Sequence, residues 1–200
     1  MSEFFGPLDS DGRVPPRQQT RVAAFLISAH GALARQFAFA LPMKLESGWQ
    51  TELNAQFYRE AEIVSLLMRA TTWVPDLALV SMAASWEAAW FPKPVEGIAD
   101  QSLALVVDLA TRAHAMHAGI RPAALLPVEA NANDPFVMAL RRIEFENGRL
   151  LQAQMLVLKG PQLLPFRNAV TSALEGRHAD IRKLWTETLE GVGINSPRAE

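Results

Sequence analysis

Apolar residues in the first half of the chain recur at steps of three and four positions. The first apolar stripe consists of Val22, Leu26, Ala29, Leu33, Phe37 and Ala40. Polar residues recur every seven positions, at Arg21, Ser28 and Arg35. An α-helix places these two sets on different faces, one buried and one solvated. The pattern therefore predicts an amphipathic helix over this window.

Two later windows repeat the pattern. The second stripe consists of Trp49, Leu53, Phe57, Val64, Leu67, Thr71 and Val74, and a third consists of Phe166, Val170, Leu174, Ile181, Trp185 and Leu189. Strict alternation of apolar and polar residues, which marks a strand, is nowhere sustained for more than a few positions. These observations favour an all-α fold.

Proline and glycine divide the chain into six proline-poor windows. The breaks lie at Pro42, at Pro75, and in residues 91–97, 119–135 and 159–165. Asp residues stand at three window starts: Asp76 follows Pro75, Asp100 precedes an apolar segment, and Asp134 precedes Pro135. Asp is a favoured N-cap, and proline is favoured at the first helical position. The sequence predicts a single-domain bundle of about six helices.

The domain boundaries follow from composition. With 200 residues, half of them hydrophobic, the chain is large enough for one sizeable core. Residues 1–16 are rich in glycine, proline and short polar side chains, which is typical of a flexible tail. We expect the helical domain to span residues 17–192, with a second flexible tail over residues 193–200.

Charge and motif content exclude several function classes. The net charge is −2 and there are no cysteines, so a nucleic-acid partner is disfavoured, thiolate metal sites are excluded, and a cytoplasmic location is expected. No phosphate-binding loop or serine-hydrolase motif is present, which favours a non-enzymatic role. His30 and Arg35 interrupt the apolar segment from Val22 to Leu41, so we expect no membrane span.

Two histidines stand three positions apart in the segment LATRAHAMHAG. On a helix, His114 and His117 project toward one side, and the surrounding stripe is small and apolar. The same helical projection assigns Asp108 and Arg112 to the water-facing side. The two histidines are therefore predicted to lie on the buried stripe of their helix.

His30 and Glu60 also interrupt apolar stripes, each on a different predicted helix. Histidine nitrogens and carboxylate oxygens are common metal ligands. One hypothesis is therefore a metal or haem site formed by His30, His114 and His117 with Glu60. The alternative, which requires no cofactor, is that these histidines are ordinary core or interface residues.

The segment SWEAAWFPKP places Trp86 and Trp90 one helical turn apart, followed by Phe91. Between Asp76 and Trp90 the only other charge is Glu87, so this helix must be covered on nearly all sides. The three aromatic residues form either an interaction surface or part of the core. A homodimer would provide the required cover, and two-fold dimers are the commonest assemblies.

Three functional hypotheses remain. The first is a non-catalytic regulator or adaptor that binds an unknown protein partner as a homodimer and holds no cofactor. The second is a metal- or haem-binding helical protein. The third is a coat protein that lies on a lipid or polymer surface through the amphipathic segment from Val22 to Leu41.

Overall fold

The computed structural model describes residues 8–43, 45, 47–74 and 93–191. These residues form five α-helices: α1 (Pro16–Ala40), α2 (Ser47–Ala70), α4 (Gln101–Gly119), α5 (Pro135–Leu158) and α6 (Arg167–Gly191). Two short 3₁₀ helices, η1 (Pro122–Leu125) and η2 (Pro161–Phe166), connect them. The predicted all-α class is confirmed, with five α-helices in the described part instead of about six. The expected helix from Asp76 to Trp90, with Trp86, Trp90 and Phe91, lies outside the described residues.

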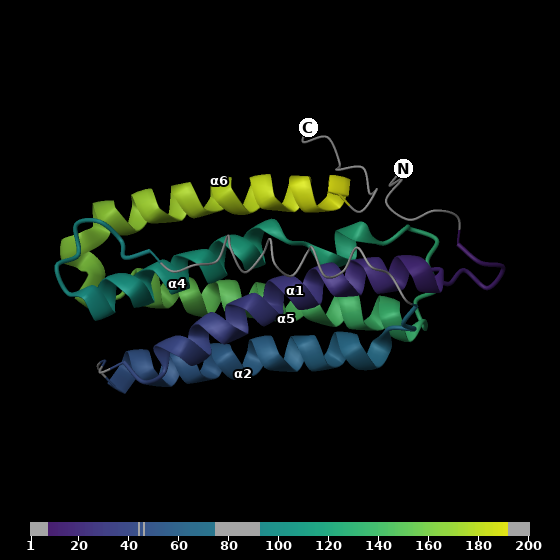
Figure 1. Ribbon diagram of the computed structural model, residues 1–200, viewed down its shortest axis with the longest axis horizontal. Coiled ribbons are helices and arrows are strands. Elements are labelled where there is room, and N and C mark those ends of the chain that lie inside the picture. The colour runs from purple at the N-terminus through teal and green to yellow at the C-terminus, as the bar shows by residue number, and fades with distance from the viewer. Residues whose placement is uncertain (1–7, 44, 46, 75–92, 192–200) are drawn as a thin grey trace.

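Four of the helices close into a bundle. α1 packs along α2, α2 contacts α5, α5 contacts α4, and α4 contacts α1. α6 packs on the outer side of α4, at the opposite edge of the molecule from α2 (Figure 1). Among the described helices, α4 is consequently covered by three neighbours, α1, α5 and α6.

The helix starts agree with the sequence signals. The Asp100 carboxylate accepts hydrogen bonds from the backbone N–H groups of Ser102 and Leu103 at the start of α4. The Asp134 carboxylate accepts one from the N–H of Phe136, with proline at the first position of α5. Each cap satisfies backbone donors that have no partner within the helix.

The apolar stripes meet in one core. Its largest fully buried side chains include Phe25, Phe37, Phe136, Leu26, Leu33, Leu67, Leu109, Met116, Ile120 and Leu140. An 18-residue window of α1 has a mean hydropathy of 1.3, enough by length and composition to cross a membrane, and 61% of that window is buried inside the bundle. Burial of this extent is what a core helix shows.

The expectation that Asp108 and Arg112 face water is wrong. Asp108 is fully buried and Arg112 is 4% exposed. α6 covers this side of α4, and Arg177 from α6 binds the Asp108 carboxylate. The backbone N–H of Lys93 also donates to that carboxylate at 2.9 Å. Helical projection alone gave no sign of this cover because α6 lies far along the chain.

Part of the expected N-terminal tail is described, over residues 8–15. Val14 is only 1% exposed and belongs to the core. The N–H of Asn131 donates to the carbonyl of Gly12 at 2.7 Å. Gly12 has a φ of 71°, a left-handed conformation that glycine adopts without strain. These contacts hold residues 8–15 against the bundle ahead of α1.

Candidate metal centre

Each of the four bundle helices contributes one polar side chain to a cluster in the core. The members are His30 from α1, Glu60 from α2, His117 from α4 and Gln154 from α5, and all four residues are at most 2% exposed. They interrupt otherwise apolar stripes, so packing of those stripes brings them together. We call this set the central cluster.

Glu60 bridges the two histidines of the central cluster. His30 Nδ1 lies 2.7 Å from Glu60 Oε2, and His117 Nε2 lies 2.8 Å from Glu60 Oε1. The two imidazole rings stack with centroids 6.1 Å apart and planes 23° from parallel. One ligand atom from each of the three residues lies within 4.8 Å of the others.

The Glu60 carboxyl is ionised at neutral pH. Its complete burial opposes ionisation, but the attraction and hydrogen bond of His117, together with those of His30, outweigh this effect and lower the pKa of Glu60 to about 2. A buried carboxylate requires a compensating positive charge. Within the cluster, a proton shared with the imidazoles or a bound cation can provide that charge.

Gln154 contacts Nδ1 of His117, the ring nitrogen that does not face Glu60. Its amide nitrogen lies 3.0 Å from His117 Nδ1 and its amide oxygen lies 3.4 Å from the same atom. The amide can therefore donate to a neutral ring or, after rotation, accept from a ring that carries its proton on Nδ1. Such a partner orients a histidine whose other nitrogen binds a metal.

The hydrogen bonds continue from the central cluster toward the exterior. Gln154 donates to Gln56 at 3.1 Å, and Gln56 donates to Glu52 at 2.8 Å. A cavity of about 20 Å³ is lined by these three side chains together with Trp49 and other apolar residues of α1, α2, α4 and α5. This volume holds about one water molecule, which needs roughly 10–15 Å³.

One ring nitrogen of His30 makes no hydrogen bond to the described residues. Its Nε2 is buried and has no hydrogen-bond partner within the described part of the chain. Nδ1 of His30 faces Glu60, so Nε2 lies on the opposite side of the ring. A buried nitrogen there would ordinarily have water or a polar group as a hydrogen-bond partner. Within the described residues, the hydrogen bond that positions His30 is therefore the one to Glu60.

The donor set suits a transition metal. Two imidazole nitrogens and one carboxylate oxygen match the His₂Glu ligands found at zinc sites with one further position. Tetrahedral zinc with bonds of about 2.0–2.1 Å separates its ligand atoms by about 3.3 Å. The 2.7 and 2.8 Å separations join the two histidine nitrogens to different oxygens of Glu60, and one ligand atom from each residue lies within 4.8 Å of the others, so the three side chains must adjust to surround one ion.

His114 is not part of the central cluster. Its ring lies edge-on to His178 of α6, with centroids 5.3 Å apart, and its Nδ1 is buried without a hydrogen-bond partner in the described chain. Burial, with the nearby His178 and His117, lowers the pKa of His114 to about 4. Of the four predicted ligands, the structure therefore brings together His30, Glu60 and His117.

Gln154 and Gln56 are not among the site residues that the sequence pattern predicts. Gln154 occupies the buried stripe of α5 between Leu150 and Leu158. A glutamine at such a position requires hydrogen-bond partners inside the core. A polar residue that interrupts an apolar stripe is the signal that could have identified Gln154. The same kind of signal identified Glu60.

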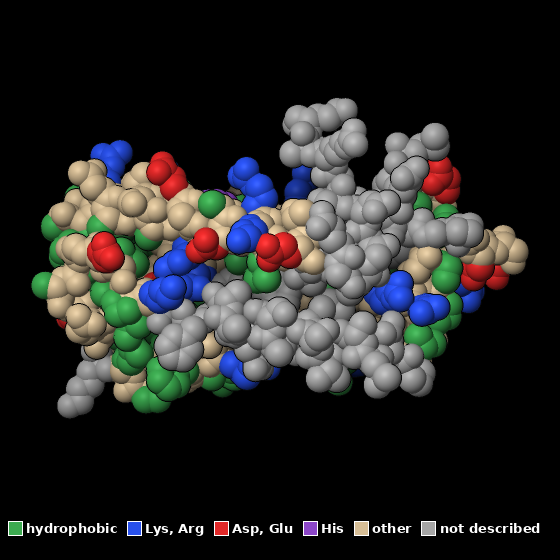
Figure 2. Space-filling model, turned by 45° about the horizontal axis from the view of Figure 1, so that its top comes forward, with side chains coloured by type: hydrophobic (Ala, Val, Ile, Leu, Met, Phe, Trp, Pro, Cys, Tyr) green, Lys and Arg blue, Asp and Glu red, His purple; other side chains and the backbone are tan. Residues whose placement is uncertain are grey.

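Surface charge adds no second candidate on the face shown in Figure 2. There, acidic and basic side chains of the described residues are interspersed (Figure 2). Elsewhere among the described residues, ion pairs join Arg142 to Glu62 and Arg121 to Glu144. A broad basic area of the kind that binds nucleic acid is not seen among the described residues of this face.

No protein-family model matches the sequence, and comparisons with curated proteins and with solved structures gave no match.

Proposed function

We propose that the protein is a metal-binding helical bundle in which His30, Glu60 and His117 hold one divalent transition-metal ion. The observation that carries the proposal is the convergence of two imidazoles and an ionised carboxylate from three helices at a fully buried point. Buried charges in proteins are paired or coordinate metals. Zinc is the first candidate because it accepts this mixture of ligands.

The proposed role of the ion is structural. The cavity beside the cluster is lined by Gln154 and Gln56 and by none of the three ligands, and it has room for about one water, which leaves no space there for a substrate or a porphyrin. An ion bound by His30, Glu60 and His117 would cross-link α1, α2 and α4. Because these residues converge only in the folded bundle, metal binding would contribute directly to folding stability.

The test is zinc binding to metal-free protein, followed by calorimetry and by the absorption spectrum of a Co²⁺ substitute. We expect one ion per chain and d–d bands of a low-coordinate N,O site. Glu60→Gln removes the charge while keeping the shape of the side chain, and should abolish stoichiometric binding. Glu62→Gln, two residues away and 64% exposed, is the matched control.

His117→Gln and His114→Gln form a second matched pair on the same helix. Loss of zinc in the first and retention in the second would support His117 as the ligand. Absence of stoichiometric binding by the parent, or equal binding by Glu60→Gln, would show that the cluster is a hydrogen-bonded core network without a metal.

Self-association is a second candidate, supported by an exposed apolar stripe on α5. Met138, Phe145 and Leu156 are 56%, 66% and 77% exposed. Their spacings of seven and eleven residues place them within about 20° of one line along the helix. An exposed stripe of large apolar side chains is typical of an interaction surface. A two-fold contact between α5 helices would bury it.

Sedimentation at micromolar concentration tests this second candidate. We expect a dimer of the 22.0 kDa chain that dissociates in Phe145→Glu. Phe39→Glu, at an equally exposed aromatic position on α1, should remain dimeric. A parent protein that sediments as a monomer would contradict self-association.

A further inference from the structure

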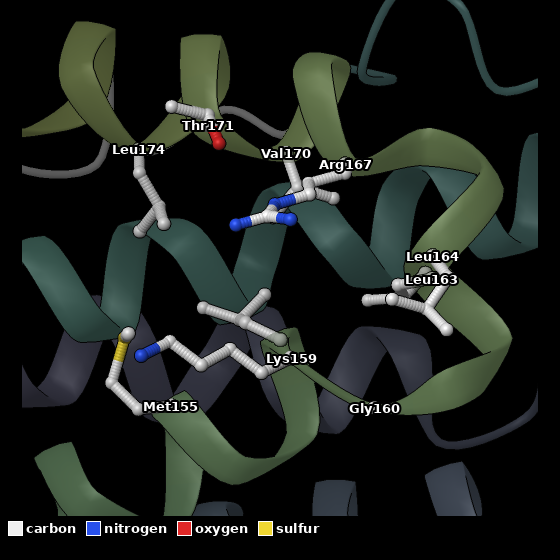
Figure 3. A pocket seen from close by; sticks show the side chains of 10 residues that line it. Met155, Lys159, Gly160, Leu163, Leu164, Arg167, Val170, Thr171 and Leu174 are labelled. Atoms are coloured by element: carbon white, nitrogen blue, oxygen red, sulfur yellow. The ribbon is translucent and has the colours of Figure 1, made fainter.

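A cavity lies between α5 and α6, away from the central cluster. It has a volume of about 420 Å³ and is lined by Met155, Leu158, Lys159, Gly160, Leu163, Leu164, Arg167, Val170, Thr171 and Leu174 (Figure 3). Ligand sites in proteins have volumes of about 300–1,000 Å³. The cavity therefore has the size of a small-molecule site.

The connection through η2 creates this cavity. Pro161 and Pro165 hold the connecting segment in a short 3₁₀ turn, and α5 and α6 both pack on α4 with little contact between each other. The space between them is closed at one end by η2 and remains open along its length. The cavity therefore results from the way η2 connects the two helices and from their separate packing on α4.

The floor of the cavity is apolar. Leu158, Leu163 and Val170 are at most 5% exposed and belong to the core. At the rim, Leu164 is 62% exposed. An apolar ligand chain laid in this groove would cover the exposed surface of Leu164 and the partly exposed side chains of Met155 and Leu174, which favours binding.

Two cations extend over this apolar floor. Lys159 from the end of α5 and Arg167 from the start of α6 point into the space between the two helices (Figure 3). Within the part of the chain that the structure describes, neither has a carboxylate partner and no acidic residue lines the cavity. By contrast, Arg177 and Lys183 of α6 have acidic partners. The cavity therefore combines apolar walls with uncompensated positive charge.

We infer that this cavity binds a free single-chain amphiphile with an anionic head, such as a medium-chain fatty acid. The acyl chain lies over Leu158, Leu163 and Val170, and the carboxylate is bound by Lys159 and Arg167. Carboxylates pair with guanidinium and ammonium groups, and the apolar floor selects the chain. The site is independent of the proposed metal site.

Calorimetric titration with decanoate below its micelle concentration tests the inference. Decanoate should bind with a stoichiometry of one, whereas decanol and decyltrimethylammonium, which lack the negative charge, should bind more weakly. Octanoate should bind about 15-fold more weakly than decanoate, because each buried methylene contributes about fourfold. Methyl NMR of Met155, assigned with Met155→Leu, reports occupation of this cavity.

Charge removal supplies the matched variants. Lys159→Gln combined with Arg167→Gln should weaken decanoate binding about tenfold, which is the scale expected for two exposed ion pairs. Arg141→Gln combined with Lys183→Gln removes two surface cations elsewhere and should leave binding unchanged. Equal binding of decanol and decanoate, or an unaffected Lys159/Arg167 variant, would overturn the inference. Binding to anionic phospholipid vesicles without binding to monomeric decanoate would also overturn it.

Discussion

Two buried carboxylates in this protein, Glu60 and Asp108, have partners of different kinds. Both side chains are completely shielded from solvent. Glu60, at the centre of the bundle, is bound by two imidazoles. Asp108, between α4 and α6, is bound by Nε of Arg112 at 2.7 Å and Nε of Arg177 at 2.9 Å. The Glu60 carboxylate is therefore paired with imidazoles, which can lose their charge. The Asp108 carboxylate is paired with guanidinium groups, which keep theirs.

The difference determines what each site can exchange. A guanidinium keeps its protons at all accessible pH values, so Arg112 and Arg177 cannot release Asp108 to another cation. An imidazole can give up its proton and bind a metal through the same nitrogen. The Asp108 site is thus a permanent ion pair between helices, whereas the Glu60 site, under the proposed function, would exchange protons for a divalent ion.

The largest expected effect is on stability when Asp108 loses its charge. Asp108→Asn leaves the buried Arg112 without full compensation and should lower the free energy of unfolding by about 3–5 kcal/mol. Glu60→Gln in metal-free protein should lower it by about 1–3 kcal/mol, because its partners can become neutral. Urea unfolding followed by circular dichroism in the presence of a chelator measures both values.

Asp180→Asn is the control for this comparison. Asp180 is 68% exposed and contacts Arg177 from the solvent side, so the substitution should have little effect. If Glu60→Gln destabilised the metal-free protein more than Asp108→Asn does, the distinction between exchangeable and fixed partners would be wrong.

The stabilisation that zinc provides should depend on Glu60 and not on Asp108. At a free concentration one hundred times the dissociation constant, one bound ion raises the free energy of unfolding by about 2.7 kcal/mol. The parent and Asp108→Asn should both gain this amount, and Glu60→Gln should gain none. The same unfolding curves with and without zinc give the result. A gain retained in Glu60→Gln would exclude Glu60 as a ligand.

A smaller effect is expected from the amide that orients His117. Gln154→Leu removes the partner of Nδ1 and should weaken zinc binding by about 10- to 100-fold, the usual scale for such partners. Gln154→Glu keeps an acceptor for Nδ1–H and should retain more affinity. Gln152→Leu changes an exposed position on the same helix and serves as the control. Calorimetry that finds all three variants alike would remove Gln154 from the site.

A further effect concerns pH and the pair formed by His114 and His178. The pKa of His114 is lowered from 6.5 to about 4 by burial and by the neighbouring His178 and His117. The unfolded chain therefore binds a proton in this range before the folded chain does. Stability is complete above pH 6.5 and is lost as the pH falls through the range from 6.5 to about 4.

His114→Phe should flatten the dependence of unfolding free energy on pH in that range, measured on metal-free protein. His178→Phe removes the other ring of the pair, whose own pKa is lowered by burial and by Arg182, and should flatten the remainder. An unchanged slope in the double variant would assign the dependence to other groups.

The sequence predicted the features that depend on local order. The apolar stripe of α1 and the caps at Asp100 and Asp134 involve residues within one or two helical turns. Spacing could not distinguish His114 from His117, because α4 is covered on several sides and only its rotation decides which histidine faces α2. The burial of Asp108 and Arg112 depends on α6, which no local pattern reveals.

The central cluster could be predicted only in part for the same reason. Interruptions of apolar stripes identified His30, Glu60 and His117 as candidates, since each needs a partner in the core. Their register relative to one another is set by how the helices slide against each other during packing. The same packing brings the Gln154 amide to the His117 ring, and Gln154 can orient that ring only in this position.

The distribution of the central cluster over four helices imposes an order on assembly during synthesis. His30 and Glu60 leave the ribosome first, and α1 and α2 can pair while the rest of the chain is still being made. His117 and then Gln154 follow much later, so the nascent hairpin presents an incomplete ligand set. Under the proposed function, metal loading would therefore require the packing of α4, which carries His117, the third ligand. A chelator present during refolding, but removed afterwards, should leave a fully folded protein that still takes up zinc.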